Sequence, residues 1–145
     1  MVAIGCDHGG FKLKEEIVSF LEKGGVEFKD FGTFNESSVD YPDIAKLVCE
    51  SIISGECENG ILVCGTGIGI SIAANKHKGI RAAVCSDEFS AKFTRLHNDA
   101  NVLCLGGRVV GPGLACELVD IFLNTGFEGG RHSLRIEKIH EIENN

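Results

Sequence analysis

The chain has 145 residues, of which 43% are hydrophobic, and it carries a formal net charge of -7. This length suits one compact domain, residues 1–145, and the negative charge argues against nucleic acid or an acidic membrane as partner. No apolar run approaches the ~20 residues that a membrane span needs, and the amino terminus shows no secretory signal, so we expect a cytoplasmic protein.

Short apolar runs alternate with longer amphipathic stretches along the whole chain. Alternation of this kind, with strands that are apolar throughout, predicts an α/β fold in which helices cover both faces of a parallel sheet. In chain order, the predicted elements are a strand at 2–6, a helix at about 10–23, a strand at 26–31, a helix at 43–54, a strand at 60–64, a helix at 69–76, a strand at 81–85, a helix at 87–97, a strand at 102–105, and helices at 111–124 and 131–143.

Three of the predicted strands are followed by polar or glycine-rich segments. These segments are Cys6–Gly10, Cys64–Gly69 and Gly106–Arg108. Ligands of open parallel sheets bind at the carboxyl ends of the strands, close to the point where the strand order reverses. We therefore expect the chemistry of this protein at these three segments.

The glycine-rich segment after the third predicted strand suits an anion, because the backbone N–H groups around Gly65, Gly67 and Gly69 can converge on one. The pattern G-x-G-x-G lacks the spacing of the dinucleotide fingerprint, although Asp87 lies about twenty residues further on, where a ribose-binding acid is sought. A P-loop is excluded by the missing G-K-[ST] ending. A tight turn without a ligand remains the alternative.

The seven cysteines are odd in number and contain no C-x-x-C pair, so neither a disulfide framework nor a structural zinc site is expected. Most of them lie in apolar runs, where a free cysteine packs as a small hydrophobe. Cys64 differs because a glycine-rich turn follows it. A phosphatase-type nucleophile would need an arginine six positions later, where Ile70 stands. Two interpretations remain: a thiol that packs at the strand end, or an acid/base thiol whose thiolate the amides and the helix start favour.

Other candidates flank the predicted elements. Asp7 and His8 follow the first strand, where the aspartate could equally cap a helix beside a surface histidine. His97 and Asn98 end a predicted helix and could form a simple C-cap. Tyr41 precedes a proline, which favours an extended or turn conformation, and it could serve the core or a ligand.

Two arginines near the end of the chain, Arg131 and Arg135, are four residues apart and therefore share one face of the last predicted helix. Such a pair is usually solvated, but two guanidinium groups on one face also suit a phosphate monoester. The spacing of histidines and carboxylates gives no convincing metal site. His132 has no assigned role and could reach a phosphate or cap the helix.

Taken together, the segments "GCDHGGFKLKEEI", "DYPDIA", "GILVCGTGIGISIAANKHKGIRAAVC", "RLHNDANVLCLGGRVVG" and "GGRHSLRIEKI" closely resemble B-type ribose-5-phosphate isomerases, which belong to a group that includes galactose-6-phosphate isomerase subunits. The resemblance runs from residue 2 to about 140. It implies a Rossmann-like three-layer sandwich with a five-stranded parallel sheet and a C-terminal helix. It also implies a homodimer, or in some members a tetramer, with sites between subunits and no metal or organic cofactor.

The resemblance assigns the catalytic roles as follows. Cys64 is the base that moves a proton between C1 and C2, and Thr66 stabilises the enediolate together with the amides from Gly65 to Gly69. His97 opens the furanose ring with help from Asp7. One branch of the family carries a glutamate base where this chain has Ile70, so Cys64 with Ile70 points to the thiol branch.

The resemblance also assigns the substrate contacts. Tyr41 lies along the sugar, and Asn98 reaches it from the facing subunit. The phosphate is held by His8, Arg131, Arg135 and Arg108. The expected reaction is the interconversion of D-ribose 5-phosphate and D-ribulose 5-phosphate in the pentose phosphate pathway. The alternatives are the same chemistry on allose or galactose 6-phosphate, and a non-catalytic module that binds a phosphate or nucleotide.

Overall fold

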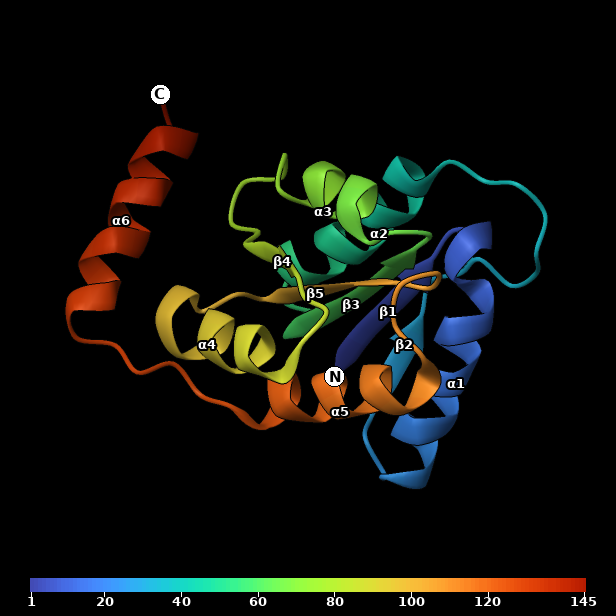
Figure 1. Cartoon of the computed structure of the whole chain (residues 1–145). Helices are drawn as coiled ribbons and strands as arrows, with labels where there is room; N and C mark the ends of the chain where they lie inside the picture. The colour runs from blue at the N-terminus through green and yellow to red at the C-terminus, as the bar shows by residue number, and fades with distance from the viewer.

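A computed structural model, which describes residues 1–145, confirms the predicted α/β fold with a five-stranded sheet. All strand pairs are parallel, and the order across the sheet is β2-β1-β3-β5-β4 (Figure 1). The two edge strands are shorter than predicted, with three residues each. The strands are β1 (Val2–Cys6), β2 (Phe28–Asp30), β3 (Asn59–Cys64), β4 (Ala82–Val84) and β5 (Val102–Gly106).

All six predicted helices are present, and their ends lie within two residues of the predicted ones. A short 3-10 turn, His8–Gly10, precedes the first of them. None of the helices is both long enough and apolar enough to cross a membrane. The helices are α1 (Phe11–Lys23), α2 (Tyr41–Ile53), α3 (Ile68–Ala74), α4 (Glu88–Asn98), α5 (Pro112–Asn124) and α6 (Arg131–Glu143).

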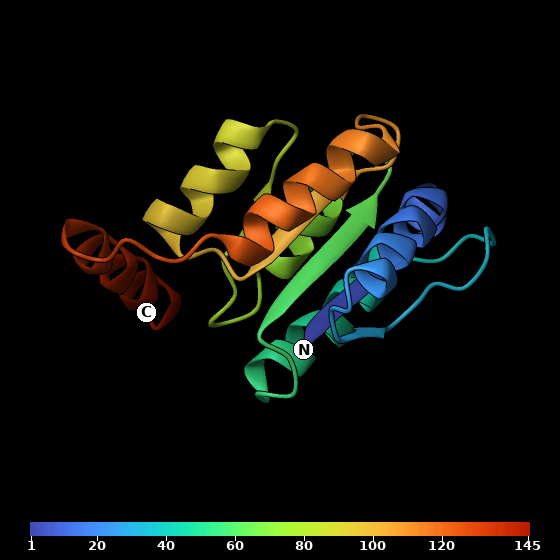
Figure 2. The ribbon, with the colours of Figure 1, turned by 90° about the horizontal axis from the view of Figure 1, so that it is seen from below.

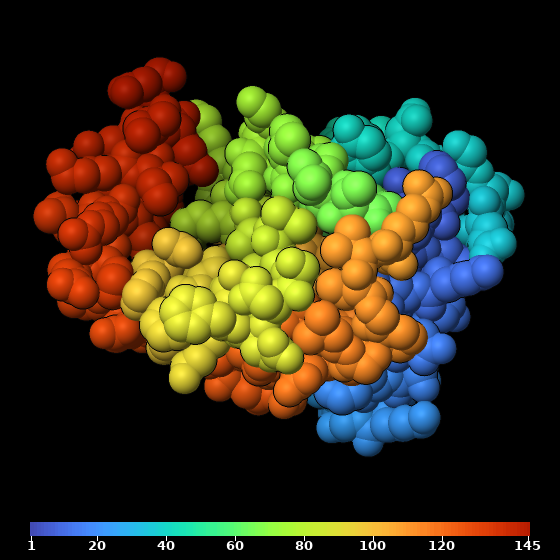
Figure 3. Space-filling view, in the orientation of Figure 1, coloured from blue at the N-terminus to red at the C-terminus, as the bar shows by residue number.

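The sheet is the middle layer of three. Helices α1, α4 and α5 lie side by side on one face, and α2 and α3 cover the other (Figures 1 and 2). Neighbouring residues of β5 show why both faces need cover: Leu103 and Leu105 pack with the first group, while Cys104 packs with the second. Helix α6 packs beside α4 and stands away from the sheet as a ridge of its own (Figure 3).

The strand order brings the three expected segments to one edge. Strands β1, β3 and β5 are neighbours at the centre of the sheet, and their carboxyl ends are level, since Cys6 pairs with Val63 and Cys64 with Gly106. The chain leaves β1 toward one edge of the sheet and β3 toward the other, so the strand order reverses between them. This is the position at which such sheets bind ligands.

The extended or turn conformation that the sequence predicts for the backbone of Tyr41 is wrong. Tyr41 is the first residue of α2, and Asp40 before it holds the extended conformation instead. The proline that follows is compatible with this start, because the first N–H groups of a helix have no partner within the helix to lose.

A buried ion pair anchors the segment that leads to Tyr41. Lys14 of α1 has no solvent exposure, and its Nζ donates to both carboxylate oxygens of Asp30 at 3.0 and 2.8 Å and to the carbonyl oxygen of Thr33 at 2.6 Å. The pair thus joins α1 to the end of β2 and to the loop after it.

Replacing Asp30 with alanine should therefore destabilise the fold strongly. The change takes from the buried ammonium group of Lys14 its hydrogen-bonded counter-ion and leaves only the carboxylate of Glu15, at 3.7 Å, which costs about 3 kcal/mol of unfolding free energy. Urea denaturation of Asp30→Ala measures this cost. Lys29→Gln is the matched control, because it breaks an exposed ion pair with Glu56 (2.7 Å) and should change the midpoint little. Equal midpoints for the two variants would contradict the prediction.

Candidate active site

The loops that follow β1, β3 and β5 are in direct backbone contact. A Cβ atom on Gly107 would lie 2.6 Å from the carbonyl oxygen of Gly9, so only glycine allows this approach. The N–H of Gly107 donates to the carbonyl oxygen of Cys64 at 2.8 Å, and the N–H of Arg108 donates to that of Gly65 at 3.0 Å. The three segments expected to carry chemistry therefore form one continuous surface.

Cys64 is the last residue of β3, and its side chain is 5% exposed. Cys64 thus ends the strand, as the sequence predicts, and it is buried like most of the other cysteines. Its distinction is a hydrogen bond: the N–H of Gly67 donates to Sγ at 3.1 Å. Gly67 reaches this position with a φ of +80°, in the left-handed region that favours glycine.

Three other buried thiols behave as the sequence predicts for small hydrophobes. Burial raises the pKa of Cys6 and of Cys49 to about 12 and that of Cys85 to about 11. Each of these thiols directs its S–H toward a backbone carbonyl oxygen. The sulfur of Cys64 instead accepts a hydrogen bond from a backbone N–H.

The loop after Cys64 presents several unpaired donors. The N–H groups of Gly65, Thr66, Gly69 and Ile70 make no hydrogen bond within the chain. The hydroxyl oxygen of Thr66 accepts from the N–H of Ile68 at 3.2 Å, which leaves its hydrogen to donate elsewhere. These donors lie beside the thiol and can stabilise a negatively charged oxygen.

Tyr41 and Arg108 flank this loop. The ring of Tyr41 lies against Gly69, where an added Cβ would meet its Cζ at 2.8 Å. The guanidinium group of Arg108 lies over Gly65, with Nη1 3.2 Å from the position of a Cβ there. Both side chains are exposed, so the loop has an aromatic neighbour and a cationic one that a ligand can reach.

Asp7 and His8 line an adjacent cavity of about 520 Å³ together with Tyr41. One carboxylate oxygen of Asp7 accepts from the N–H groups of Gly9 and Gly10 at 2.9 and 3.2 Å, so the aspartate does cap a helical turn. Nδ1 of His8 accepts from the N–H of Val39 at 3.3 Å. In the neutral ring the proton is then on Nε2, which can donate to a ligand.

The remaining predicted residues lie elsewhere in the chain. Helix α4 begins after the carboxyl end of β4 and ends before the amino end of β5, so His97 and Asn98 are separated from Cys64 by about the length of β5, roughly 13 Å. Arg131 and Arg135 are on α6, next to α4, and both are exposed. One chain does not bring these residues to Cys64.

Asp87 does not serve as a ribose-binding acid. Its Oδ1 accepts from the N–H of Ser90 at 2.7 Å, and its Oδ2 accepts from the hydroxyl of the same serine at 2.9 Å. These hydrogen bonds lower the pKa of its carboxyl group. Asp87 is the N-cap of α4.

His97 lies in a group of side chains that the sequence did not join. Its ring stacks on that of His132, with centroids 4.2 Å apart and planes inclined by 14°, and Phe93 meets its edge at 5.0 Å. Nε2 of His97 lies 3.7 Å from a carboxylate oxygen of Glu128. Burial lowers the pKa of His132, and the neighbouring His97 lowers it further, so this ring is neutral at pH 7. The structure thus gives His132 a contact that the sequence did not predict, the stacking of its ring on that of His97.

Histidine and carboxylate atoms of His97, Glu128 and His132 lie within 4.8 Å of one another, a spacing that invites a metal ion. The stacking argues against it. A metal ion bound through a ring nitrogen lies close to the plane of that ring at about 2 Å, and two stacked, nearly parallel rings offer no point that meets this condition for both. The arrangement fits two side chains, Glu128 and His132, that hold the ring of His97 better than it fits a metal centre.

Comparison with known proteins agrees with this arrangement. Residues 2–139 match the family model described as Ribose/Galactose Isomerase. The chain belongs to this family. It is 54% identical to ribose-5-phosphate isomerase B of Escherichia coli K12, over 98% of this chain and 95% of the relative. It is 42% identical to a D-erythrulose-4-phosphate isomerase of Pectobacterium atrosepticum, over 98% and 94%.

The fold matches equally well. A Clostridium thermocellum ribose-5-phosphate isomerase B structure superposes with a TM-score of 0.97 at 57% identity, covering 99% of this chain and 97% of the other. The predicted membership in the sugar-phosphate isomerases, and with it the Rossmann-like architecture, is thereby confirmed.

Proposed function

We propose that this protein interconverts D-ribose 5-phosphate and D-ribulose 5-phosphate through an enediolate, as a step of the pentose phosphate pathway. The observation that carries the proposal is the thiol of Cys64, whose sulfur accepts a hydrogen bond beside four unpaired N–H groups. A module that only binds phosphate needs the donors but not the thiol. An aldose–ketose isomerase needs both.

The chemistry assigned to this end of the sheet is one proton transfer. The thiolate of Cys64 takes the proton from C2 of the open-chain aldose, and the electrons move onto the carbonyl oxygen at C1. The free amides and the hydroxyl of Thr66 stabilise that oxygen while the enediolate exists. The proton of the C2 hydroxyl passes to the oxygen at C1, and the thiol returns its own proton to C1 as the C2 carbonyl forms, which yields the ketose and regenerates the thiolate.

Ring opening and phosphate binding require residues that one chain keeps apart from Cys64. We infer that His97 opens the ring together with Asp7 of the facing subunit, and that Asn98 contacts the sugar. His8 and Arg108 of one subunit and Arg131 and Arg135 of the other hold the phosphate. A dianion between charges from both sides is well positioned, and its binding energy orients the reacting carbons.

The proposed homodimer is supported by exposed apolar side chains near the site. They surround the carboxyl ends of the strands, where a second copy would cover them, and a monomer gains nothing from exposing them together. A tetramer would add a second interface to this dimer. The side chains are Ile68 and Ile72 of α3, Val84, Phe89 and Val109.

Two further expectations belong to this proposal. We infer that residues 1–145 act as one domain, because both hydrophobic clusters pack on the same sheet. We also place the protein in the cytoplasm, a reducing compartment in which seven free cysteines persist.

The substrate is tested directly with a panel of sugar phosphates. Ketose formation is followed by NMR in EDTA with D-ribose 5-phosphate, D-allose 6-phosphate, D-galactose 6-phosphate and D-erythrose 4-phosphate. The highest kcat/KM is expected with ribose 5-phosphate. A preference for either six-carbon sugar would replace the proposed substrate by the longer one. The four-carbon sugar is included because a relative 42% identical is a D-erythrulose-4-phosphate isomerase.

A further inference from the structure

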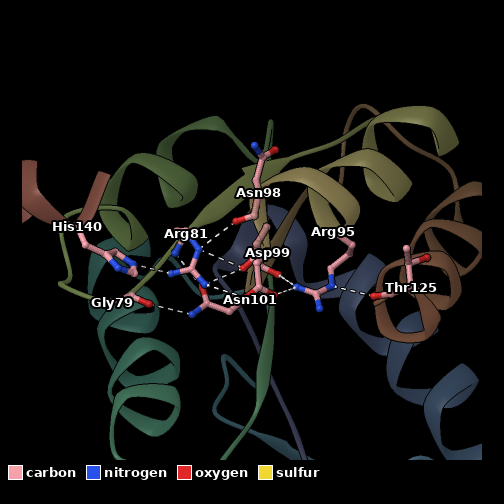
Figure 4. A network of polar contacts seen from close by, with 9 residues as sticks. Gly79, Arg81, Arg95, Asn98, Asp99, Asn101, Thr125 and His140 are labelled. Atoms are coloured by element: carbon pink, nitrogen blue, oxygen red, sulfur yellow. Dashed lines mark hydrogen bonds and ion pairs between the residues drawn. The ribbon is translucent and has the colours of Figure 1, made fainter. Parts of the chain in front are cut away.

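The corner between α4 and β5, residues 98–101, is fixed by a network of charged side chains (Figure 4). Asp99 within it has a φ of +45° and is the only residue besides glycines with a positive φ. Besides glycine, this conformation suits mainly aspartate and asparagine, whose short polar side chains can form local hydrogen bonds. Two arginines hold the corner in addition.

Arg81, just before β4, binds the end of α4 by its backbone. Its Nε lies 3.1 Å from the carbonyl oxygens of both Asn98 and Asp99, and its Nη2 donates to that of Asp99 at 2.8 Å. The last carbonyl groups of a helix lack partners within the helix and carry its negative partial charge. A guanidinium group that is only 17% exposed therefore stabilises this terminus.

Arg95 holds the same corner from inside α4. Its Nη1 donates to a carboxylate oxygen of Asp99 at 2.9 Å, and its Nε donates to the carbonyl oxygen of Thr125 at 3.1 Å. The other carboxylate oxygen of Asp99 lies 3.6 Å from Nη2 of Arg81. Asp99 thus lies between two guanidinium groups that tie it to the start of β4 and to the end of α5.

The network also reaches α6. Nη1 of Arg81 lies 3.1 Å from Nε2 of His140. A guanidinium group only donates, so Nε2 of His140 is the acceptor in this pair. Arg81 therefore contacts both the end of α4, with His97 and Asn98, and the helix that carries Arg131 and Arg135.

The side-chain amide of Asn98 takes no part in the network. Its side chain is exposed, makes no hydrogen bond, and points away from the network, while its carbonyl oxygen faces Arg81 (Figure 4). The network holds the backbone of Asn98 and leaves the side chain free for a ligand. The neighbouring His97 is held differently, because the ring of His132 stacks on its side chain.

We propose that Arg81 and Asp99 are positioning residues of the isomerase: they fix the direction in which His97 and Asn98 meet the sugar, and Arg81 fixes their relation to the phosphate-binding helix. This inference rests on the proposed function. It adds residues that touch no substrate and that act through the backbone of the α4–β5 corner.

The test measures ring opening apart from isomerisation. In a Cys64→Ala background the proton transfer is blocked, and the catalysed exchange between the α and β anomers of D-ribose 5-phosphate, followed by saturation-transfer NMR, reports ring opening alone. Adding Arg81→Gln or Asp99→Asn should reduce this acceleration by roughly 10- to 100-fold, as expected when a catalytic group is misplaced. Asparagine tolerates the left-handed backbone, so Asp99→Asn removes the charge without straining the turn.

Three comparisons make the result decisive. Lys29→Gln, which also removes a paired cation, should leave anomer exchange unchanged, and Arg81→Lys should restore part of the loss. Circular dichroism must show every variant folded; if Arg81→Gln does not fold, Asp99→Asn decides. If folded Asp99→Asn or Arg81→Gln, each in the Cys64→Ala background, catalyses anomer exchange as fast as Cys64→Ala alone, the inference is overturned.

His97→Asn in the same background separates this inference from the proposed function. If His97→Asn abolishes anomer exchange and the network variants do not, only the positioning role is wrong. If His97→Asn leaves exchange intact, or if the Cys64→Ala protein never accelerates it, the ring-opening part of the proposed function is wrong.

Discussion

Cys64→Ala should fold normally and bind substrate, yet fail to exchange the C2 proton with solvent deuterium. Loss of a positioned base should lower turnover by about 10²- to 10⁴-fold. The fold should tolerate the change because Cys64 ends its strand and alanine removes a single sulfur atom. NMR of D-ribose 5-phosphate in D₂O measures the incorporation of deuterium directly.

Two control variants identify the cause of that loss. Cys64→Ser retains an acceptor for the N–H of Gly67, so an inactive serine variant shows that the thiolate, and not the loop geometry, is required. Cys49→Ala removes a thiol from the same hydrophobic cluster, where burial raises its pKa to about 12, and it should exchange at the wild-type rate. Near wild-type exchange in Cys64→Ala would assign the loop to phosphate binding beside a bystander thiol.

The position of Cys64 at the carboxyl end of the sheet was predictable from the sequence, because one physical rule connects the alternation of strands and helices to this edge. Apolar strands that alternate with helices predict a parallel sheet, and parallel strands bring the ends of β1, β3 and β5 together. The helical conformation at Tyr41 escaped this rule, because tertiary packing decides whether the local preference of a residue before proline is kept.

The environment of His97 was beyond sequence reasoning for another reason. The link from Arg81 to His140 joins residues 59 positions apart, and Glu128 comes from a glycine-rich connection with no pattern of its own. Charged side chains at such separations are paired by tertiary structure alone. The sequence predicted that His97 and Asn98 end a helix, but not which residues hold them there.

The last prediction concerns the distance between the two halves of the site. Because His97 lies at the other end of α4 from Cys64, a complete site needs two chains if both residues act on one sugar. A mixed dimer of Cys64→Ala and His97→Asn then contains one site with both defects and one with none. When equal amounts exchange subunits at random, half of the dimers are mixed, so about one quarter of wild-type activity should return.

Native mass spectrometry establishes the exchange, and mixing Cys64→Ala with the double variant should return no activity. If mixed dimers form and stay inactive, Cys64 and His97 do not share a site across the interface, and the ring opener must be sought among the residues near Asp7 and Tyr41.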